Sequence, residues 1–344
     1  MKTLLKFSSI TFAFAIGIFF AACNNNEKTK TTITDSTATA EHKHSFRCPM
    51  NCEKGKTYEK EGNCPVCGMS LEHFDGVDNG LTYKMGFTSN PATVEAGKTA
   101  DFSFTPKVVG KETEAVPLDV KHEKKIHLIV VSNDLSYFEH IHPEYQPNGA
   151  FQIKVLDKNK PYANGPGHNE TRFLSGGDYL LFADYAPTGG SHQVEKIPVN
   201  VKGTPKAAVM YSADKLTASS DKYSVQLQVD GGKLTTGNQV HIAGKVMKDG
   251  KDVDVNTLEN YLGAKAHMVV ISLNDKEYLH VHPEVEGGKF DLHTTFKKPG
   301  IHRGWIQFQS EGKVHTVDFV FNVAVGNAAE PKTTDTKASE HSGH

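Results

Sequence analysis

The chain carries almost no net charge and has few cysteines. Its 344 residues include 38 Lys or Arg and 40 Asp or Glu, which gives a formal net charge of −2. Basic and acidic residues are mixed along the sequence, so it lacks the basic stripe that nucleic-acid binding needs, and we expect no nucleic-acid partner. Cysteine occurs only five times. The position of each cysteine is therefore informative.

Long hydrophobic runs are also missing, apart from one near the start. Lys2 and Lys6 precede an apolar stretch over residues 7–20, which is too short for a stable membrane-spanning helix and is typical of a secretory signal. Small residues then lead to Cys23. This ending resembles the lipobox of bacterial lipoproteins, which implies a signal peptide over residues 1–22 and lipidation of Cys23. An ordinary signal peptide with a chance cysteine is the alternative.

A lipidated Cys23 would anchor the protein to a membrane of the cell envelope, facing the periplasm or the cell surface. Residues 23–45 are mostly Thr, Asn, Lys and Ala, so they cannot bury a core and predict a flexible tether. Residues 327–344 are similar in composition and predict a disordered tail. With Cys23 assigned to the lipid, the other four cysteines form one even set.

Those four cysteines fall within twenty residues. Cys48 and Cys52 form a C-x3-C pair, and Cys64 and Cys67 form a C-x2-C pair. Four thiolates that meet at a point satisfy tetrahedral Zn²⁺, and a smaller number satisfies Cu(I). Two disulfides in an exported domain are the alternative. The short gap within each pair and the Cys-Pro step at each first cysteine favour a metal site.

The segment over residues 46–74 resembles a known family. The runs FRCPM at residues 46–50 and NCPVCGM at residues 63–69 are similar to the heavy-metal-binding domain found beside copper and silver efflux adaptors and heavy-metal pumping ATPases. The resemblance implies copper or zinc as the bound ion and a heavy-metal efflux system as a partner. The chain departs from the family at Asn51 and Cys52, where His and Pro are usual. The added thiolate favours Cu(I) and Zn²⁺ over harder ions.

Two later segments repeat each other. Residues 80–203 and 220–326 align with matching histidines, glycines and prolines. Both contain short runs of alternating apolar and polar residues, broken by Gly, Asp and Asn turns, as in antiparallel strands. Helix is expected only as one or two turns near residues 256–261. The predicted fold is mainly β, with a small Cys-rich metal-binding module followed by two immunoglobulin-like antiparallel β-sandwich repeats.

Three histidines in the first repeat are predicted to share one face of a hairpin. A two-residue turn at Asn133-Asp134 would place His127 directly across from His140, whereas a three-residue loop would shift the pairing and turn His127 to the other face. Side chains alternate along a strand, so His140 and His142 would point the same way as His127. Three convergent imidazoles can hold Cu(II) or Zn²⁺.

The second repeat keeps His267, His280 and His282 at the same separations. It therefore predicts a second site of the same kind. His192 and His315, near the strand that follows in each repeat, are candidate fourth ligands. Asp184 and Gln307 occupy matching positions as different donors, so the two sites need not be equivalent. The sequence identifies no partner for His122, His168, His241, His293 and His302.

These features predict an exported lipoprotein that binds copper or zinc for sequestration or for delivery to an efflux system, and not an enzyme. One alternative is a scaffold or adhesion β-sandwich protein with a structural zinc site. Another is a cupin-like or superoxide-dismutase-like metalloenzyme, because His-x-His on a β-fold also occurs there. The repeat histidines could instead be structural, with hydrogen bonds to Glu144 and Glu284.

Overall fold

The structure is a computed structural model of the whole chain. It describes residues 45–48, 53, 56–60, 62, 64–65, 71–74, 79–161, 168–281 and 283–326. The expected signal peptide, the expected tether up to residue 44, which includes Cys23, and the expected tail lie outside these residues, whereas Ser45 at the end of the expected tether begins the first strand. Among the described residues, no helix has the length and apolar character needed to cross a membrane.

A small three-stranded antiparallel sheet forms the N-terminal module. Its strand order is β2-β1-β3, with β1 at Ser45–Arg47, β2 at Thr57–Tyr58 and β3 at Glu72–Phe74. Cys48 and Cys64 are buried and cluster with Leu71. A core this small gives little hydrophobic stabilisation, and domains of this size usually need a metal or a covalent link.

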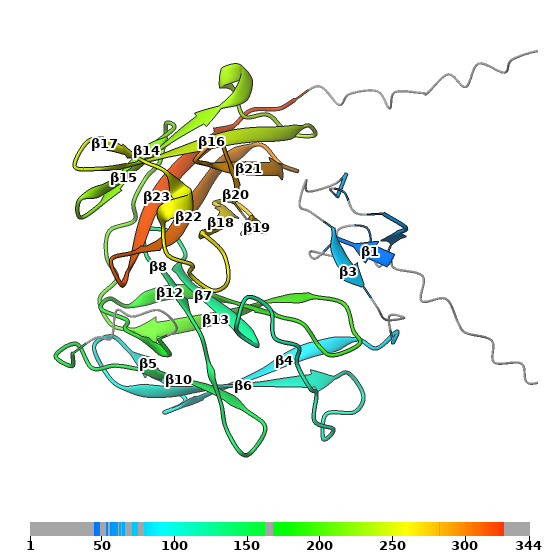
Figure 1. Cartoon of the computed structure of the whole chain (residues 1–344). Coiled ribbons are helices and arrows are strands. Elements are labelled where there is room, and N and C mark those ends of the chain that lie inside the picture. Colours follow the sequence, from blue (N-terminus) through cyan, green and yellow to red (C-terminus); the bar gives the residue numbers. More distant parts are fainter. Residues whose placement is uncertain are drawn as a thin grey trace, which may run out of the picture. The chain divides into compact units, whose positions relative to one another are not determined.

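The first repeat is a sandwich of two sheets (Figure 1). One sheet has the order β11-β10-β6-β4, with β9 paired to β10, and the other has the order β5-β13-β12-β7-β8. The pairs β5–β13 and β10–β11 are parallel, and the other described pairs are antiparallel. The strands are β4 (Tyr83–Asn90), β5 (Val94–Glu95), β6 (Ala100–Val108), β7 (Ile126–Ser132), β8 (Phe138–Ile141), β9 (Glu144–Tyr145), β10 (Phe151–Val155), β11 (Glu170–Thr171), β12 (Gly177–Tyr185) and β13 (Gln193–Lys202).

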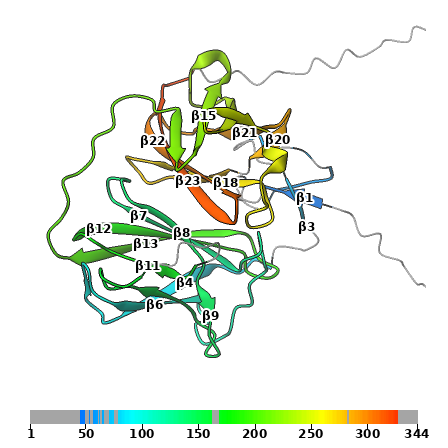
Figure 2. The same ribbon diagram turned by 60° about the vertical axis from the view of Figure 1, so that its left-hand side comes forward.

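The second repeat is a sandwich of the same design (Figure 2). One sheet has the order β14-β15-β16-β21-β20, with β17 paired to β16, and the other has the order β19-β18-β22-β23. The strands are β14 (Thr217–Ser220), β15 (Tyr223–Val229), β16 (Gln239–Lys248), β17 (Lys251–Val253), β18 (Ala266–Ser272), β19 (Tyr278–Val281), β20 (Glu284–Glu286), β21 (Lys289–Thr295), β22 (Gly300–Ser310) and β23 (Lys313–Val323).

The predicted fold class is confirmed. The described chain is mainly β, and its two repeats are immunoglobulin-like sandwiches. Helical structure in the described part is limited to two 3₁₀ turns, Asp230–Gly232 and Val255–Thr257. The second of these overlaps the start of the segment expected to be helical.

Strands β7 and β18 depart from the alternating pattern because both of their faces are buried. In β7, Leu128 and Val130 pack in the core of the first repeat. Ile129 and Val131 point the other way and join Val269 of the second repeat. We call this shared group the inter-repeat cluster. Its buried members are Ile129, Val131, Leu135, Phe182, Val269, Ile271, Tyr278 and Trp305.

Two reciprocal aromatic pairs lie in the inter-repeat cluster. Phe138 of the first repeat stacks on Trp305 of the second, with ring centroids 4.5 Å apart and planes inclined by 10°. Phe182 of the first repeat stacks on Tyr278 of the second at 5.1 Å and 25°. Phe138 matches Tyr278, and Phe182 matches Trp305, in the alignment of the repeats. The contact is therefore self-complementary, like the interface of a two-fold symmetric dimer.

The turn between β7 and β8 is longer than predicted. The amide of Ser132 bonds to the carbonyl of Tyr137 at 3.3 Å, so four residues rather than two form the turn. The Ser132 hydroxyl accepts the amides of Ser136 and Tyr137 at 3.1 and 3.0 Å and donates to Asp134 at 2.6 Å. The prediction of a two-residue turn is wrong because it could not weigh these side-chain bonds to the backbone.

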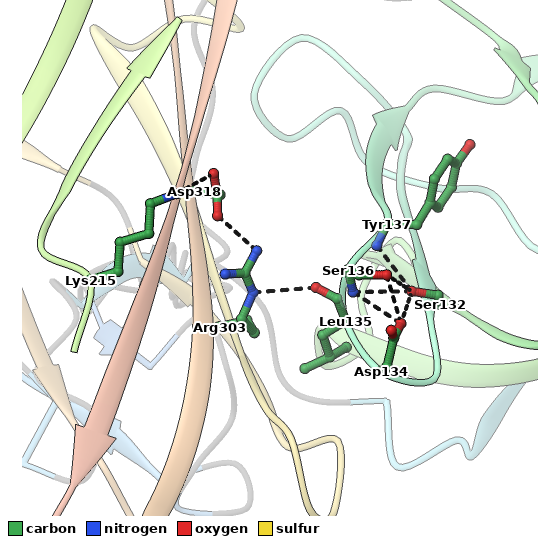
Figure 3. Close-up of polar contacts among 8 residues, drawn as sticks. All are labelled: Ser132, Asp134, Leu135, Ser136, Tyr137, Lys215, Arg303 and Asp318. Carbon is green, nitrogen blue, oxygen red and sulfur yellow. Dashed lines mark hydrogen bonds and ion pairs between the residues drawn. The ribbon is translucent and has the colours of Figure 1, made fainter. Parts of the chain in front are cut away.

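Figure 3 shows how the second repeat contacts this turn. Arg303 of β22 donates from Nε to the carbonyl of Leu135 at 3.3 Å, and its Nη2 pairs with Asp318 at 2.9 Å. Leu135 is fully buried although its φ is +57°. A leucine is costly in that left-handed conformation, so burial in the inter-repeat cluster must offset the strain.

Replacement of Trp305 tests this interface. Trp305 is 3% exposed, so Trp305→Ala should lower the free energy of unfolding by about 3–5 kcal/mol. The control Leu174→Ala removes a side chain that is 66% exposed. It should change the free energy of unfolding by less than about 0.5 kcal/mol. Denaturant unfolding measures both. Equal effects of the two substitutions would contradict a packed inter-repeat cluster.

Candidate metal centre

Three histidines of the first repeat come together beside the inter-repeat cluster. His127 lies in β7 on the same face as Ile129, His140 lies in β8, and His142 follows the end of β8. The three are 3%, 2% and 2% exposed. Their ring centroids are 4.7 to 5.2 Å apart, and one nitrogen of each ring lies within 4.8 Å of the others. The three imidazoles thus share one face, as the alternation of side chains predicts.

The strand register differs from the predicted one. Strands β7 and β8 pair Ile129 with His140, so His127 does not lie directly across from His140. The error is two residues, because the turn holds four residues and not two. A shift of two leaves every side chain on its original face. The prediction that the three imidazoles converge is therefore correct, although the predicted register is wrong.

The outer nitrogens of two rings are tied to carbonyl oxygens. His127 Nε2 is 3.0 Å from the carbonyl oxygen of Lys121, and His140 Nδ1 is 2.7 Å from Oε1 of Gln307. Carbonyl oxygens can only accept, so both of these nitrogens carry the proton. The lone pairs of His127 Nδ1 and His140 Nε2 are left facing each other across 3.0 Å. A cation placed against both nitrogens would stabilise this arrangement.

The partner of His140 belongs to the other repeat. Gln307 lies in β22, and its Nε2 donates to Thr316 Oγ1 at 3.0 Å. With Oε1 toward His140, the amide nitrogen of Gln307 is placed to donate to Thr316, so both ends of the side chain are hydrogen-bonded. Outer partners of this kind orient an imidazole and raise its basicity as a metal ligand. The histidine group of the first repeat is therefore completed across the inter-repeat contact.

His142 is held differently. Its backbone amide donates to the carbonyl of His168 at 3.0 Å. Both of its ring nitrogens are buried, and neither has a hydrogen-bond partner among the described residues. Burial, followed by the charges of His140 and His127, holds the pKa of His142 well below its ordinary value of 6.5. The ring is therefore neutral and offers a lone pair, at a desolvation cost of about 1–3 kcal/mol for an unbonded polar group.

The second repeat keeps the same backbone arrangement. Strands β18 and β19 pair Val269 with His280, which matches the register of the first repeat. His267 is 1% exposed, and its Nε2 lies 3.0 Å from the carbonyl oxygen of Tyr261. That carbonyl is the counterpart of the one that holds His127. His282 and the side chain of His280 lie outside what the structure describes.

His122 lies near a histidine of each repeat. Its ring centroid lies 6.1 Å from that of His127 and 5.2 Å from that of His267. His122 sits in the tight turn that presents the Lys121 carbonyl, with φ of +46°. No pattern in the sequence indicates this position, because the contact joins different repeats.

The two proposed fourth ligands do not take equivalent places. His192 Nε2 is 2.5 Å from a carboxylate oxygen of Asp184. His315 stacks on Phe308 at 5.2 Å and packs against Tyr223 at 4.5 Å, in the core of the second repeat. Neither belongs to the group formed by His127, His140 and His142 among the described residues. Glu144, offered as a structural partner of these histidines, is exposed.

The cysteine module is described in part. Cys48 is 3% exposed and Cys64 is 1% exposed, and both lie in one small apolar cluster. Cys52 and Cys67 lie outside the described residues, as do Met50 and Met69. Two sulfur donors buried together in an apolar setting fit a soft metal ion.

The chain belongs to the family described as a domain of unknown function, DUF8832, whose model matches residues 77–203 and residues 218–325. A second family model, described as a heavy metal binding domain, matches residues 47–73. The resemblance of that segment to a heavy-metal-binding domain is therefore confirmed. A search of the curated proteins finds no match.

Among solved structures, the chain is similar to the adhesin FdeC of Escherichia coli. The identity is 11% and the TM-score is 0.20, over 74% of this chain and 68% of that one. It is also similar to the adhesin InvE of Yersinia pseudotuberculosis, with 10% identity and a TM-score of 0.21, over 70% of this chain and 59% of that one. Identity and TM-score are both too low for the functions of these proteins to bear on this chain.

The tautomers of the histidine group can be read directly. In the metal-free protein, His127 should carry its proton on Nε2 and His140 on Nδ1, because each of these nitrogens faces a carbonyl oxygen. Long-range ¹H–¹⁵N NMR spectra distinguish the two forms. The control His302, whose Nδ1 is 3.1 Å from the carbonyl of Gly300, should carry its proton on Nδ1. A proton on Nε2 of His140 would show that the lone pairs do not converge.

Proposed function

We propose that this two-repeat member of the DUF8832 family is an exported lipoprotein that captures copper or zinc in the cell envelope and stores the ions or passes them to an efflux system. One observation carries the proposal. The chain that contains a heavy-metal-binding domain also buries three imidazoles whose ligand atoms converge, with His127 Nδ1 and His140 Nε2 only 3.0 Å apart.

The two kinds of donor would serve different ions. The thiolates of Cys48, Cys52, Cys64 and Cys67 are soft ligands and would take Cu(I) or Zn²⁺. The imidazoles of the repeats are borderline ligands and would take Cu(II) or Zn²⁺. A protein with both could hold copper in either oxidation state outside the cytoplasm.

The second repeat supports a matching imidazole site. We propose His267, His280 and His282 as its ligands, because the backbone register and the carbonyl that faces His267 repeat those of the first site. In this second site, Asp184 would take the place beside the ligands that Gln307 takes in the first site. Its carboxylate would make the second site more negative than the first.

The envelope location rests on Cys23, which we propose as the lipid-anchored residue of the mature protein. The ions would be cargo, and the protein would act by binding and release, not by catalysis. A scaffold protein with a structural zinc site in the cysteine module is the competing function. It predicts one bound Zn²⁺ and no ion at the histidines.

Metal titration separates these functions. The full chain is titrated with Cu(I), Cu²⁺ and Zn²⁺, as is a variant with Cys48, Cys52, Cys64 and Cys67 changed to Ser. The Ser variant should lose Cu(I) but keep Cu²⁺, and the further substitution His127→Ala should remove a Cu²⁺ equivalent. His302→Phe, which keeps a ring packed against Phe296, should not. If the protein binds only one Zn²⁺ and the Ser variant binds none, the result would contradict metal capture and support the scaffold function.

Gln307 gives a second test, because it would act on the metal through His140. Gln307→Ala should weaken Cu²⁺ binding at the first site by about 10–100-fold without changing the number of ions bound. Gln307→Glu keeps an acceptor oxygen and should restore affinity. Gln309→Ala, on the same strand and hydrogen-bonded to Glu259, is the matched control. Isothermal titration measures all three, and equal affinities would refute a role for Gln307.

A further inference from the structure

A second group of metal-binding side chains lies in the second repeat, on a different sheet from the first. His241 of β16 pairs directly with His293 of β21, and Asp291 precedes His293 by two residues. Their neighbours Ile242 and Leu292 point into the core. Because side chains alternate, His241, His293 and Asp291 all project from the outer face of the sheet. One ligand atom from each lies within 4.8 Å of the others.

The contacts within this group join both imidazoles to one carboxylate. His293 Nε2 is 3.0 Å from Oδ2 of Asp291, and His241 Nε2 contacts Oδ1 of the same carboxylate. The other nitrogen of His241, Nδ1, lies 2.6 Å from Oδ2 of Asp230. Both imidazoles thus contact one carboxylate, and the three ligand atoms converge on one point. A divalent cation bound there would replace the protons that bridge these atoms in the metal-free protein.

Exposure fits a site that exchanges ions with solvent. The side chains of His241 and His293 are 33% and 29% exposed, whereas that of Asp291 is 11% exposed. The two imidazoles stack with centroids 4.8 Å apart and planes inclined by 21°. The carboxylate is thus held beneath two accessible rings.

The first repeat has no such group at the matching place. Asp101 pairs with Lys154 there in the same register, and Gln152 stands where the second repeat has Asp291. Gln152 bonds to Ser103 at 3.1 Å. The sandwich therefore forms without these histidines, so the fold does not require them in the second repeat.

We propose that His241, Asp291 and His293 bind a divalent transition-metal ion, with Asp230 positioning His241. Two imidazoles and a carboxylate are the ligands of a borderline divalent ion such as Zn²⁺ or Co²⁺ and not of Cu(I). The carboxylate–histidine pair of Asp230 and His241 is the usual outer partner of such a ligand. The inference does not depend on the function proposed for the cysteines or for His127, His140 and His142.

The test uses the full chain with the cysteine module and the first histidine site disabled, by Cys→Ser at the four cysteines and His127→Ala. Co²⁺ is the probe, followed by equilibrium dialysis and by its visible absorption. In this background, the further substitution His293→Ala should remove one equivalent of Co²⁺, and Asp291→Asn should weaken its binding at least about tenfold.

Matched controls come from the first repeat. Asp101→Ala and Lys154→Ala alter the same register positions of the other sandwich and should leave Co²⁺ binding unchanged. Circular dichroism and the melting temperature in EDTA confirm that each variant is folded. If His293→Ala does not fold, the isosteric Asp291→Asn decides. An unchanged number and affinity of Co²⁺ ions in Asp291→Asn, with a lower melting temperature in EDTA, would show a purely structural cluster and overturn the proposal.

Discussion

The packing of β7 against β18 through the inter-repeat cluster is the interaction on which the proposed centre depends. It buries apolar side chains on the face of each sheet that a single sandwich would leave in water. The two aromatic pairs, Phe138 with Trp305 and Phe182 with Tyr278, fix the position of one repeat on the other. That position brings Gln307 to 2.7 Å from His140. A sandwich on its own could not supply this partner.

The two histidine groups share one electrostatic principle. In each, an oxygen atom that accepts a hydrogen bond faces an outer ring nitrogen and orients the ring, so the other ring nitrogen points toward the neighbouring ligand atoms. For His127 and His140 the acceptors are amide oxygens, and for His241 the acceptor is the carboxylate of Asp230. His127 and His140 are buried, whereas His241 is partly exposed. An ion bound as we propose would leave the first site slowly and would exchange with solvent at the second.

Local patterns in the sequence were sufficient for the fold class. Alternating apolar residues and Gly or Asp turns indicate sandwiches, and the matching histidines reveal the duplication. The convergence of His127, His140 and His142 was predicted because it depends on strand alternation, which survives a register error of two residues. The four-residue turn could not be predicted, since it depends on the Ser132 hydroxyl and on the burial of Leu135 against the second repeat. Gln307 was predicted only as a donor that matches Asp184, and its contact with His140 was missed because it joins two repeats. Asp291 was missed because its contact with His241 depends on register between residues far apart in the chain.

X-ray absorption at the copper edge tests the central claim most directly. The full chain with its four module cysteines changed to Ser is loaded with Cu²⁺ and compared with the same protein carrying His140→Ala. The account predicts nitrogen ligands at about 2.0 Å with the outer-shell scattering of several imidazoles, reduced by the substitution. A spectrum without imidazole scattering, or one that His140→Ala leaves unchanged, would contradict it.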